Sequence, residues 1–135
     1  MPKIDIAALP IDARTGYPPP HDKAVVGRSR KRLGAAAGLD QFGVNLTTLK
    51  PGAASTLRHW HENEDEFVYV LEGELALVED EGETIMLVNR SDRDAVYLEI
   101  GTRAKRERAH YSDVDLAVVK DEAGLRYSRK DGTPL

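Results

Sequence analysis

The chain has 135 residues, the length of one domain, and its 41% hydrophobic and 31% charged residues are typical of a globular protein. The formal net charge of -4 disfavours binding to nucleic acid and to anionic membranes. The absence of cysteine excludes disulfides, thiolate zinc sites and cysteine nucleophiles, so any metal must be held by His, Asp or Glu. No apolar run approaches the length of a membrane span or of a signal-peptide core, and we therefore expect a cytoplasmic protein.

The first 40 residues are predicted to form an irregular arm that packs on the main domain or on a partner subunit. Five of the seven prolines fall in the first 33 residues, including Pro18 to Pro20, and no helical or strand period is visible there. The basic run at 28–32 is more typical of a solvated patch than of a phosphate contact. Residues 33–39 are long enough for one helical turn.

Residues 41–135 are predicted to form an all-β domain with a C-terminal strand and tail. Short runs with a period of two alternate with turn residues, which is the pattern of half-buried strands. Seven or eight such strands predict a sandwich or barrel. The expected strands cover residues 42–48, 55–61, 66–71, 74–78, 83–88, 95–100, 115–120 and 125–128, with a hairpin turn at 80–82 and longer loops at 89–94, 101–113 and 121–124.

The strand at 66–71 is apolar on both faces. Val68 and Val70 lie on one face, and Phe67, Tyr69 and Leu71 lie on the other. A strand of this kind needs cover on both sides. We expect one face to look into the barrel and the other to pack against the arm or a partner subunit.

Two histidines and one glutamate form the candidate metal site. His59 and His61 are two residues apart, so in a strand both imidazoles point to the same face. Glu66 follows after a polar turn and opens the next strand. Two imidazoles and a carboxylate suit iron, manganese, zinc, nickel or cobalt, and do not select among them. The alternative is that the histidines are ordinary surface or hydrogen-bonded residues and that the acidic cluster at 62–66 is a solvated turn.

Fixed spacings around these residues carry a family resemblance. Gly52, His59-Trp60-His61, Glu66 and Gly73 resemble the first motif of the cupin superfamily: glycine, five residues, His-x-His, three or four residues, Glu, six residues, Gly. The one departure is an extra residue before His59. The motif covers 52–73, and the strand pattern extends a looser resemblance to about 41–120.

The resemblance implies a jelly-roll β-barrel, often a homodimer, behind the proline-rich arm. It also implies that His59, His61 and Glu66 are three of the usual four metal ligands. Glu66 is preferred over Glu64 because it alone is followed by six residues and then glycine.

The second cupin motif, which carries the fourth ligand, is missing its central part. That motif contains Pro-x-Gly followed by His and Asn, but neither proline nor histidine occurs between His61 and His110. Residues 82–86 resemble the strand that enters the motif, and 87–90 resemble its end. Either a segment is absent from the residues given between Met86 and Leu87, or the deletion is real.

The remaining histidines are poor substitutes for the fourth ligand. His110 lies in a charged stretch typical of an exposed loop, and His21 lies in the arm. Three protein ligands and water still form a workable catalytic site.

The resemblance implies a metal-binding cupin that holds a small polar or anionic metabolite in the barrel mouth. A metal-dependent dioxygenase and a sugar or sugar-phosphate isomerase are the enzyme classes considered. The alternative is a non-catalytic binding or sensing cupin with an incomplete metal site. Tyr97 and Glu99 share a strand face and are candidate substrate contacts, or ordinary strand residues.

Overall fold

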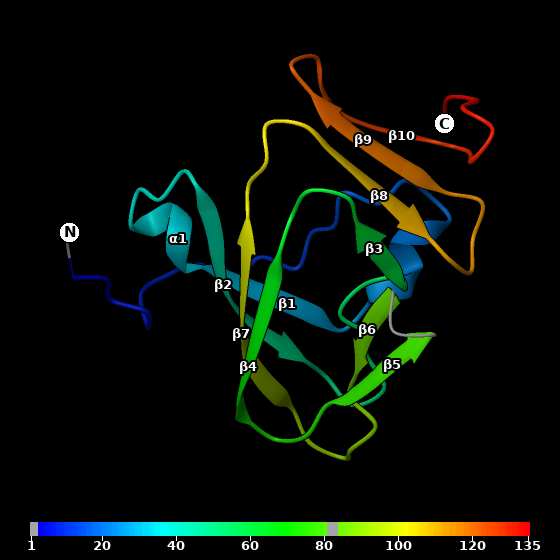
Figure 1. The fold of residues 1–135 in the computed structure, drawn as a ribbon. Helices are drawn as coiled ribbons and strands as arrows, with labels where there is room; N and C mark the ends of the chain where they lie inside the picture. The colour runs from blue at the N-terminus through cyan, green and yellow to red at the C-terminus, as the bar shows by residue number, and fades with distance from the viewer. Residues whose placement is uncertain (1–2, 81–83) are drawn as a thin grey trace.

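The computed structural model describes residues 3–80 and 84–135. The strands of this part of the chain form two antiparallel sheets that face each other (Figure 1). One sheet has the order β1-β2-β7-β4 and the other has the order β10-β9-β8-β3-β6-β5. The strands are β1 (Arg28–Arg32), β2 (Phe42–Leu49), β3 (His59–His61), β4 (Glu66–Glu72), β5 (Ala76–Asp80), β6 (Thr84–Val88), β7 (Ala95–Thr102), β8 (Glu107–Tyr111), β9 (Ala117–Asp121) and β10 (Gly124–Ser128). The predicted all-β jelly-roll barrel is confirmed.

The helical content is small. A 3-10 helix, η1 (His21–Val25), precedes β1, and a single turn of α-helix, α1 (Leu33–Ala36), follows it. The predicted helical turn at 33–39 is therefore present in its first half. Among the described residues, no helix is long and apolar enough to cross a membrane.

Two predictions about irregular segments are wrong. The arm contributes β1, which pairs along its whole length with β2 from Arg28↔Leu49 to Arg32↔Asn45. The expected loop at 101–113 contains β8, which pairs with β3 and β9. Both strands contain many charged residues, and sequence reasoning therefore assigns them to solvent-exposed segments. In β8, however, every second side chain is buried. Tertiary pairing overrides the polar composition of these segments.

Strand β6 runs without interruption through the point at which the second motif is shortened. Met86 pairs with Val78 of β5 and Leu87 pairs with Leu77, in one continuous register. The register of β5 and β6 is therefore unbroken across the point at which the motif is shortened. The expected hairpin turn at 80–82 falls largely outside the described residues.

The core is divided between the two ends of the barrel. Leu49, Ala53 and Tyr97 form one buried cluster, and Ala109, Tyr111, Leu116 and Val118 form the other. A pocket lined by both polar and apolar side chains lies beside these clusters. This division leaves room for a pocket between the two sheets.

The outer face of β4 is exposed. Phe67, Tyr69 and Leu71 all project from it into solvent. The arm does not cover them, because it lies along β1 at the opposite edge of the sheet, where Asp12 forms a bridge with Arg30. The expected cover by a partner subunit stays a prediction.

Candidate metal centre and pocket

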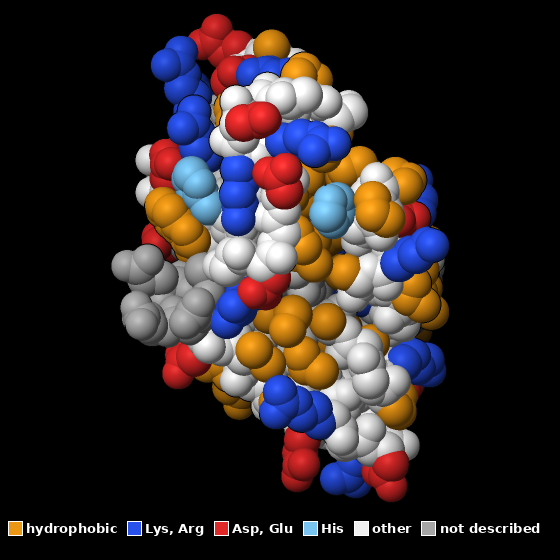
Figure 2. All heavy atoms as spheres, turned by 90° about the vertical axis from the view of Figure 1, so that its right-hand side faces the viewer, with side chains coloured by type: hydrophobic (Ala, Val, Ile, Leu, Met, Phe, Trp, Pro, Cys, Tyr) orange, Lys and Arg blue, Asp and Glu red, His pale blue; other side chains and the backbone are white. Residues whose placement is uncertain are grey.

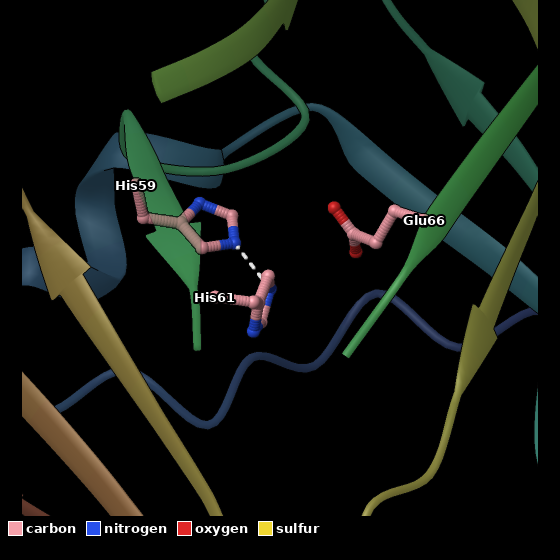
Figure 3. A group of neighbouring side chains, drawn as sticks. All are labelled: His59, His61 and Glu66. Carbon is pink, nitrogen blue, oxygen red and sulfur yellow. Dashed lines mark hydrogen bonds between the residues drawn. The ribbon is translucent and has the colours of Figure 1, made fainter. Parts of the chain in front are cut away.

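The two histidines of β3 point into the barrel from one face of the strand, as predicted. Trp60 between them points outward and stacks on His110 of β8, with ring centroids 4.3 Å apart. His59 is buried, and its Nδ1 donates to the Leu57 carbonyl at 2.8 Å. Burial also lowers the pKa of His59, which favours the neutral ring. The Nε2 of His59 therefore carries a lone pair and faces His61 Nε2 at 2.9 Å (Figure 3).

Glu66 meets the histidines from the other sheet. It opens β4, and Figure 3 shows its carboxylate reaching from that strand towards the two rings. One ligand atom from each of His59, His61 and Glu66 lies within 4.8 Å of the others. Although the residue keeps contact with solvent, burial among the pocket walls raises the pKa of its carboxyl, and His61 opposes that shift. The three residues named from the sequence are thus brought together.

The donor set fits a divalent transition metal. Two imidazole nitrogens and one carboxylate oxygen are ligands that such ions accept, and the hydrogen bond from His59 Nδ1 to the Leu57 carbonyl leaves the lone pair of His59 Nε2 available. The Nδ1 of His61 is buried without a hydrogen bond among the described residues, and lies 4.0 Å from Glu107 Oε1. A ring that binds a metal through Nε2 carries its proton on Nδ1, towards that carboxylate.

A second acidic group beside His61 is less suited to a metal. Glu64 and Glu107 also approach His61. However, Glu64 accepts hydrogen bonds from Lys120 Nζ at 2.8 Å and from the Ala104 backbone N–H. Glu107 accepts the backbone N–H groups of residues 62, 63 and 108. These carboxylates are already engaged, so the geometry favours Glu66 over Glu64 as the metal-facing carboxylate.

A pocket of about 240 Å³ opens beside the three residues. The two candidate substrate contacts named from the sequence, Tyr97 and Glu99, line it. Glu99 accepts two hydrogen bonds from Arg30, at 2.9 and 3.0 Å, and one from Thr47 Oγ1 at 3.2 Å. The buried Tyr97 hydroxyl makes no hydrogen bond of good geometry with the described residues, and burial raises its pKa, so it remains a proton donor.

Arg28 and Arg30 are pocket residues that the sequence analysis missed. They were interpreted as parts of a solvated basic run, but both line the pocket from β1. Arg28 is 6% exposed. The signal in the sequence is the period of two in Arg28, Arg30 and Arg32, which places all three side chains on one face of a strand. Tyr17 of the arm, which sequence reasoning also left unassigned, reaches the same pocket.

The other histidines and the end of the second motif lie outside the site. His110 lies on the outer face of its strand and donates from Nε2 to Glu62 at 2.7 Å, as its exclusion as a ligand requires. His21 belongs to η1. Asn89 is fully buried and donates to the carbonyls of Leu49 and Arg93, which gives it a structural role. Where β6 reaches the pocket, it contributes Met86 and Leu87, which are not metal ligands.

The surface near this site is mixed in charge. Figure 2 shows the side of the molecule that carries the six-stranded sheet, where basic and acidic side chains are interspersed among apolar ones. The expectation that the partner is a small molecule and not a nucleic acid stays a prediction.

The chain is similar to a known protein family and to several solved structures. Residues 45–103 match the model of the Cupin_2 family, the cupin domain. A sugar phosphate isomerase from a cupin superfamily, from Silicibacter pomeroyi, is 44% identical and has a TM-score of 0.93, over 99% of this chain and 96% of that one. No curated protein matches the chain significantly.

Two more distant structures share the fold. A protein of Acidithiobacillus ferrooxidans, provisionally named a sugar phosphate isomerase, is 24% identical with a TM-score of 0.70, over 80% of each chain. The polyketide cyclase RemF of Streptomyces resistomycificus is 20% identical with a TM-score of 0.59, over 76% of this chain and 79% of that one.

Proposed function

The chain belongs to the cupin superfamily, and on that premise we propose that it is a metal-dependent isomerase of small phosphorylated sugars. The observation that carries the proposal is the pocket itself. It joins the His59, His61 and Glu66 group to a second carboxylate, Glu99, which an arginine holds in place. The 44% identical relative named a sugar phosphate isomerase supports the same reaction class.

His59, His61 and Glu66 would hold the divalent ion. When bound, the ion supplies a Lewis acid that polarises a carbonyl or hydroxyl oxygen of the sugar. Iron, manganese, zinc, nickel and cobalt all suit this donor set. The shortened second motif supplies no fourth protein ligand, so water would complete the shell of a bound ion.

Glu99 is the proposed general base. An aldose-to-ketose conversion moves one proton from the carbon beside the carbonyl to the carbonyl carbon, while a hydroxyl proton moves between the two oxygens, so no oxidant is needed. Arg30 donates two hydrogen bonds to the Glu99 carboxylate and fixes its direction. The Tyr97 hydroxyl supplies a donor on the same wall of the pocket. These three side chains perform the proton transfer and position the oxygens.

The test combines metal analysis with solvent-isotope exchange. We expect the purified protein to hold about one divalent ion per chain, His59→Ala to lose it, and His110→Ala, whose ring lies outside the barrel, to keep it. Phosphorylated aldoses incubated with the loaded protein in D₂O should gain deuterium at the carbon that is deprotonated. Glu99→Gln should slow this exchange by a factor of about 10² to 10⁴.

The shortened second motif favours a second candidate, a binding or sensing cupin without chemistry. Saturable binding of phosphorylated sugars, with no deuterium exchange and no isomer formed by the metal-loaded protein, would overturn the isomerase and favour this candidate.

A further inference from the structure

Arg28 is a buried cation that forms no ion pair with the residues that the structure describes. It begins β1, is 6% exposed and lines the pocket. Its Nη1 donates to the Ser55 carbonyl at 2.5 Å. Among residues 3–80 and 84–135, no carboxylate lies within ion-pair distance of its guanidinium, whereas Arg30 on the same strand is neutralised by Glu99. One donor of the guanidinium is engaged by a carbonyl of the described residues, which leaves its other donors for a ligand in the pocket that the side chain lines.

The environment of Arg28 is costly for a charge unless an anion enters. Burial lowers the pKa of Arg28, and the neighbouring cation Arg30 lowers it further. Arginine nevertheless stays protonated in proteins, so the charge must be balanced in another way. Its planar fork matches the oxygens of a phosphate or carboxylate in two parallel hydrogen bonds.

Hydroxyl groups surround the same part of the pocket. Ser55, Thr56, Tyr17 and Tyr127 line it together with Arg28. The Tyr17 hydroxyl lies 2.5 Å from Thr56 Oγ1. These neutral groups can donate to an anion without adding charge, so the wall near Arg28 is suited to an anionic group.

The chain links this wall directly to the metal-facing histidine. Arg28 holds the carbonyl of Ser55, and two residues later the carbonyl of Leu57 accepts the Nδ1 proton of His59. Arg28, His59 and Glu66 line the same pocket, so a ligand whose anionic group lies at Arg28 shares that pocket with the metal-facing residues.

We propose that Arg28, with the hydroxyls of Tyr17 and Thr56, forms the subsite that binds the phosphate group of the substrate. The sugar part of this assignment rests on the proposed function, whereas the binding of an anion rests on Arg28 alone. The competing explanation is that Arg28 merely braces the Ser55 carbonyl.

The experiment measures anion binding to the full chain and to two variants. Inorganic phosphate, glucose 6-phosphate and glucose are titrated by calorimetry into the wild type, into Arg28→Met and into Arg32→Met. Arg32 is the matched control because it lies on the same strand, is half exposed and pairs with Asp12. We expect both phosphate ligands to bind the wild type and the control at one site, and Arg28→Met to bind them at least about tenfold more weakly. Weak binding of glucose should not change.

Stability separates the subsite from a brace. Without an anion, Arg28→Met should melt at or above the wild-type temperature because the variant no longer buries an unpaired charge. Phosphate should raise the melting temperature of the wild type and not that of the variant. A wild type that binds no phosphate ligand saturably, or an Arg28→Met that binds as tightly as the wild type, overturns the subsite.

A second variant covers the case in which Arg28→Met does not fold. Arg28→Lys keeps the charge and loses the fork, so it should bind glucose 6-phosphate several-fold more weakly; unchanged affinity overturns the proposal. The two proposals fail separately. If phosphate binding depends on Arg28 but no deuterium exchange occurs, the isomerase proposal is overturned and the subsite is not. If exchange occurs and Arg28→Lys leaves the KM for the phosphorylated sugar unchanged, the subsite is overturned and the isomerase proposal is not.

Discussion

Arg30 of β1 and Glu99 of β7 form a bidentate ion pair across the intervening strand β2, at 2.9 and 3.0 Å. Their side chains are 17% and 19% exposed, so the pair is partly shielded from water. The arm segment thereby contributes a charged group to the pocket that the central strands alone could not supply. Because Glu99 is the proposed base, the orientation of the catalytic carboxylate depends on a strand that sequence reasoning assigned to the arm.

Removing one partner of the Arg30–Glu99 pair should lower the free energy of unfolding more than removing both partners together. Arg30→Met leaves the Glu99 carboxylate partly buried without its cation, and we expect a loss of about 1 to 3 kcal/mol in the free energy of unfolding. The double variant Arg30→Met/Glu99→Gln should lose less than the sum of the two single variants. Urea denaturation of the four proteins measures the coupling. Additive losses would show that the pair is not energetically coupled.

The sequence was sufficient for the residues whose placement depends on local alternation. His59 and His61 share a face because strand side chains alternate, and Tyr97 and Glu99 share a face for the same reason. The loop between His61 and Glu66 was short enough for the motif spacing to bring the carboxylate back to the rings. These predictions required no knowledge of which strands pair.

The features that could not be predicted from the sequence depend on pairing between segments that are distant in the chain. Arg28 and Arg30 enter the pocket because β1 pairs with β2. The period of two in the run 28–32 indicates that the two side chains share a face of a strand, but it does not indicate that this face is buried. The strand β8 was missed for a related reason. Its outward residues Arg108 and His110 are polar, whereas its inward Glu107 is buried by loop contacts that only the fold creates.

Glu107 should be necessary for the turn that joins the two sides of the metal group. Its carboxylate is 7% exposed and accepts the backbone N–H groups of Glu62, Asn63 and Arg108. Glu107→Ala leaves these groups unpaired, and we expect a loss of about 2 to 4 kcal/mol of stability together with weaker metal retention.

The matched control for that variant is Glu62→Ala, in the same turn. Within residues 3–80 and 84–135, the Glu62 side chain accepts one hydrogen bond, from the outward ring of His110, and this substitution should change stability by about 0.5 kcal/mol or less. Thermal denaturation and elemental analysis of both variants provide the measurements. If the two substitutions lower stability and metal retention equally, Glu107 is not specifically required for the turn.

Acid should weaken the attachment of the arm through Asp12. The side chain and backbone of Arg14, and the side chain of Arg32, donate to the Asp12 carboxylate and hold its pKa well below the ordinary value of 3.8. A carboxyl with a lowered folded-state pKa stabilises the fold above its unfolded pKa and loses that contribution as pH falls through the folded value. The wild type should therefore melt above Asp12→Asn at neutral pH, and the gap should narrow as pH falls below 3.8.

Melting curves over a pH series measure that gap, with Asp40→Asn in the exposed loop before β2 as the control. The control should show no gap at any pH. A gap for Asp12→Asn that persists unchanged in strong acid would contradict the carboxylate as its source.

The apolar outer face of β4 should bury itself against a second copy of the chain. The arm was the other candidate cover, and it lies at the opposite edge of the sheet, along β1. An exposed apolar row on an edge strand is typical of an interaction surface. We expect the wild type to have twice the mass of one chain by light scattering, and Tyr69→Lys, which changes a side chain that is 57% exposed, to behave as a monomer.

Leu77→Lys, on β5 and 53% exposed, is the matched control and should remain dimeric. A monomeric wild type, or equal dissociation of both variants, would contradict the assignment of this face.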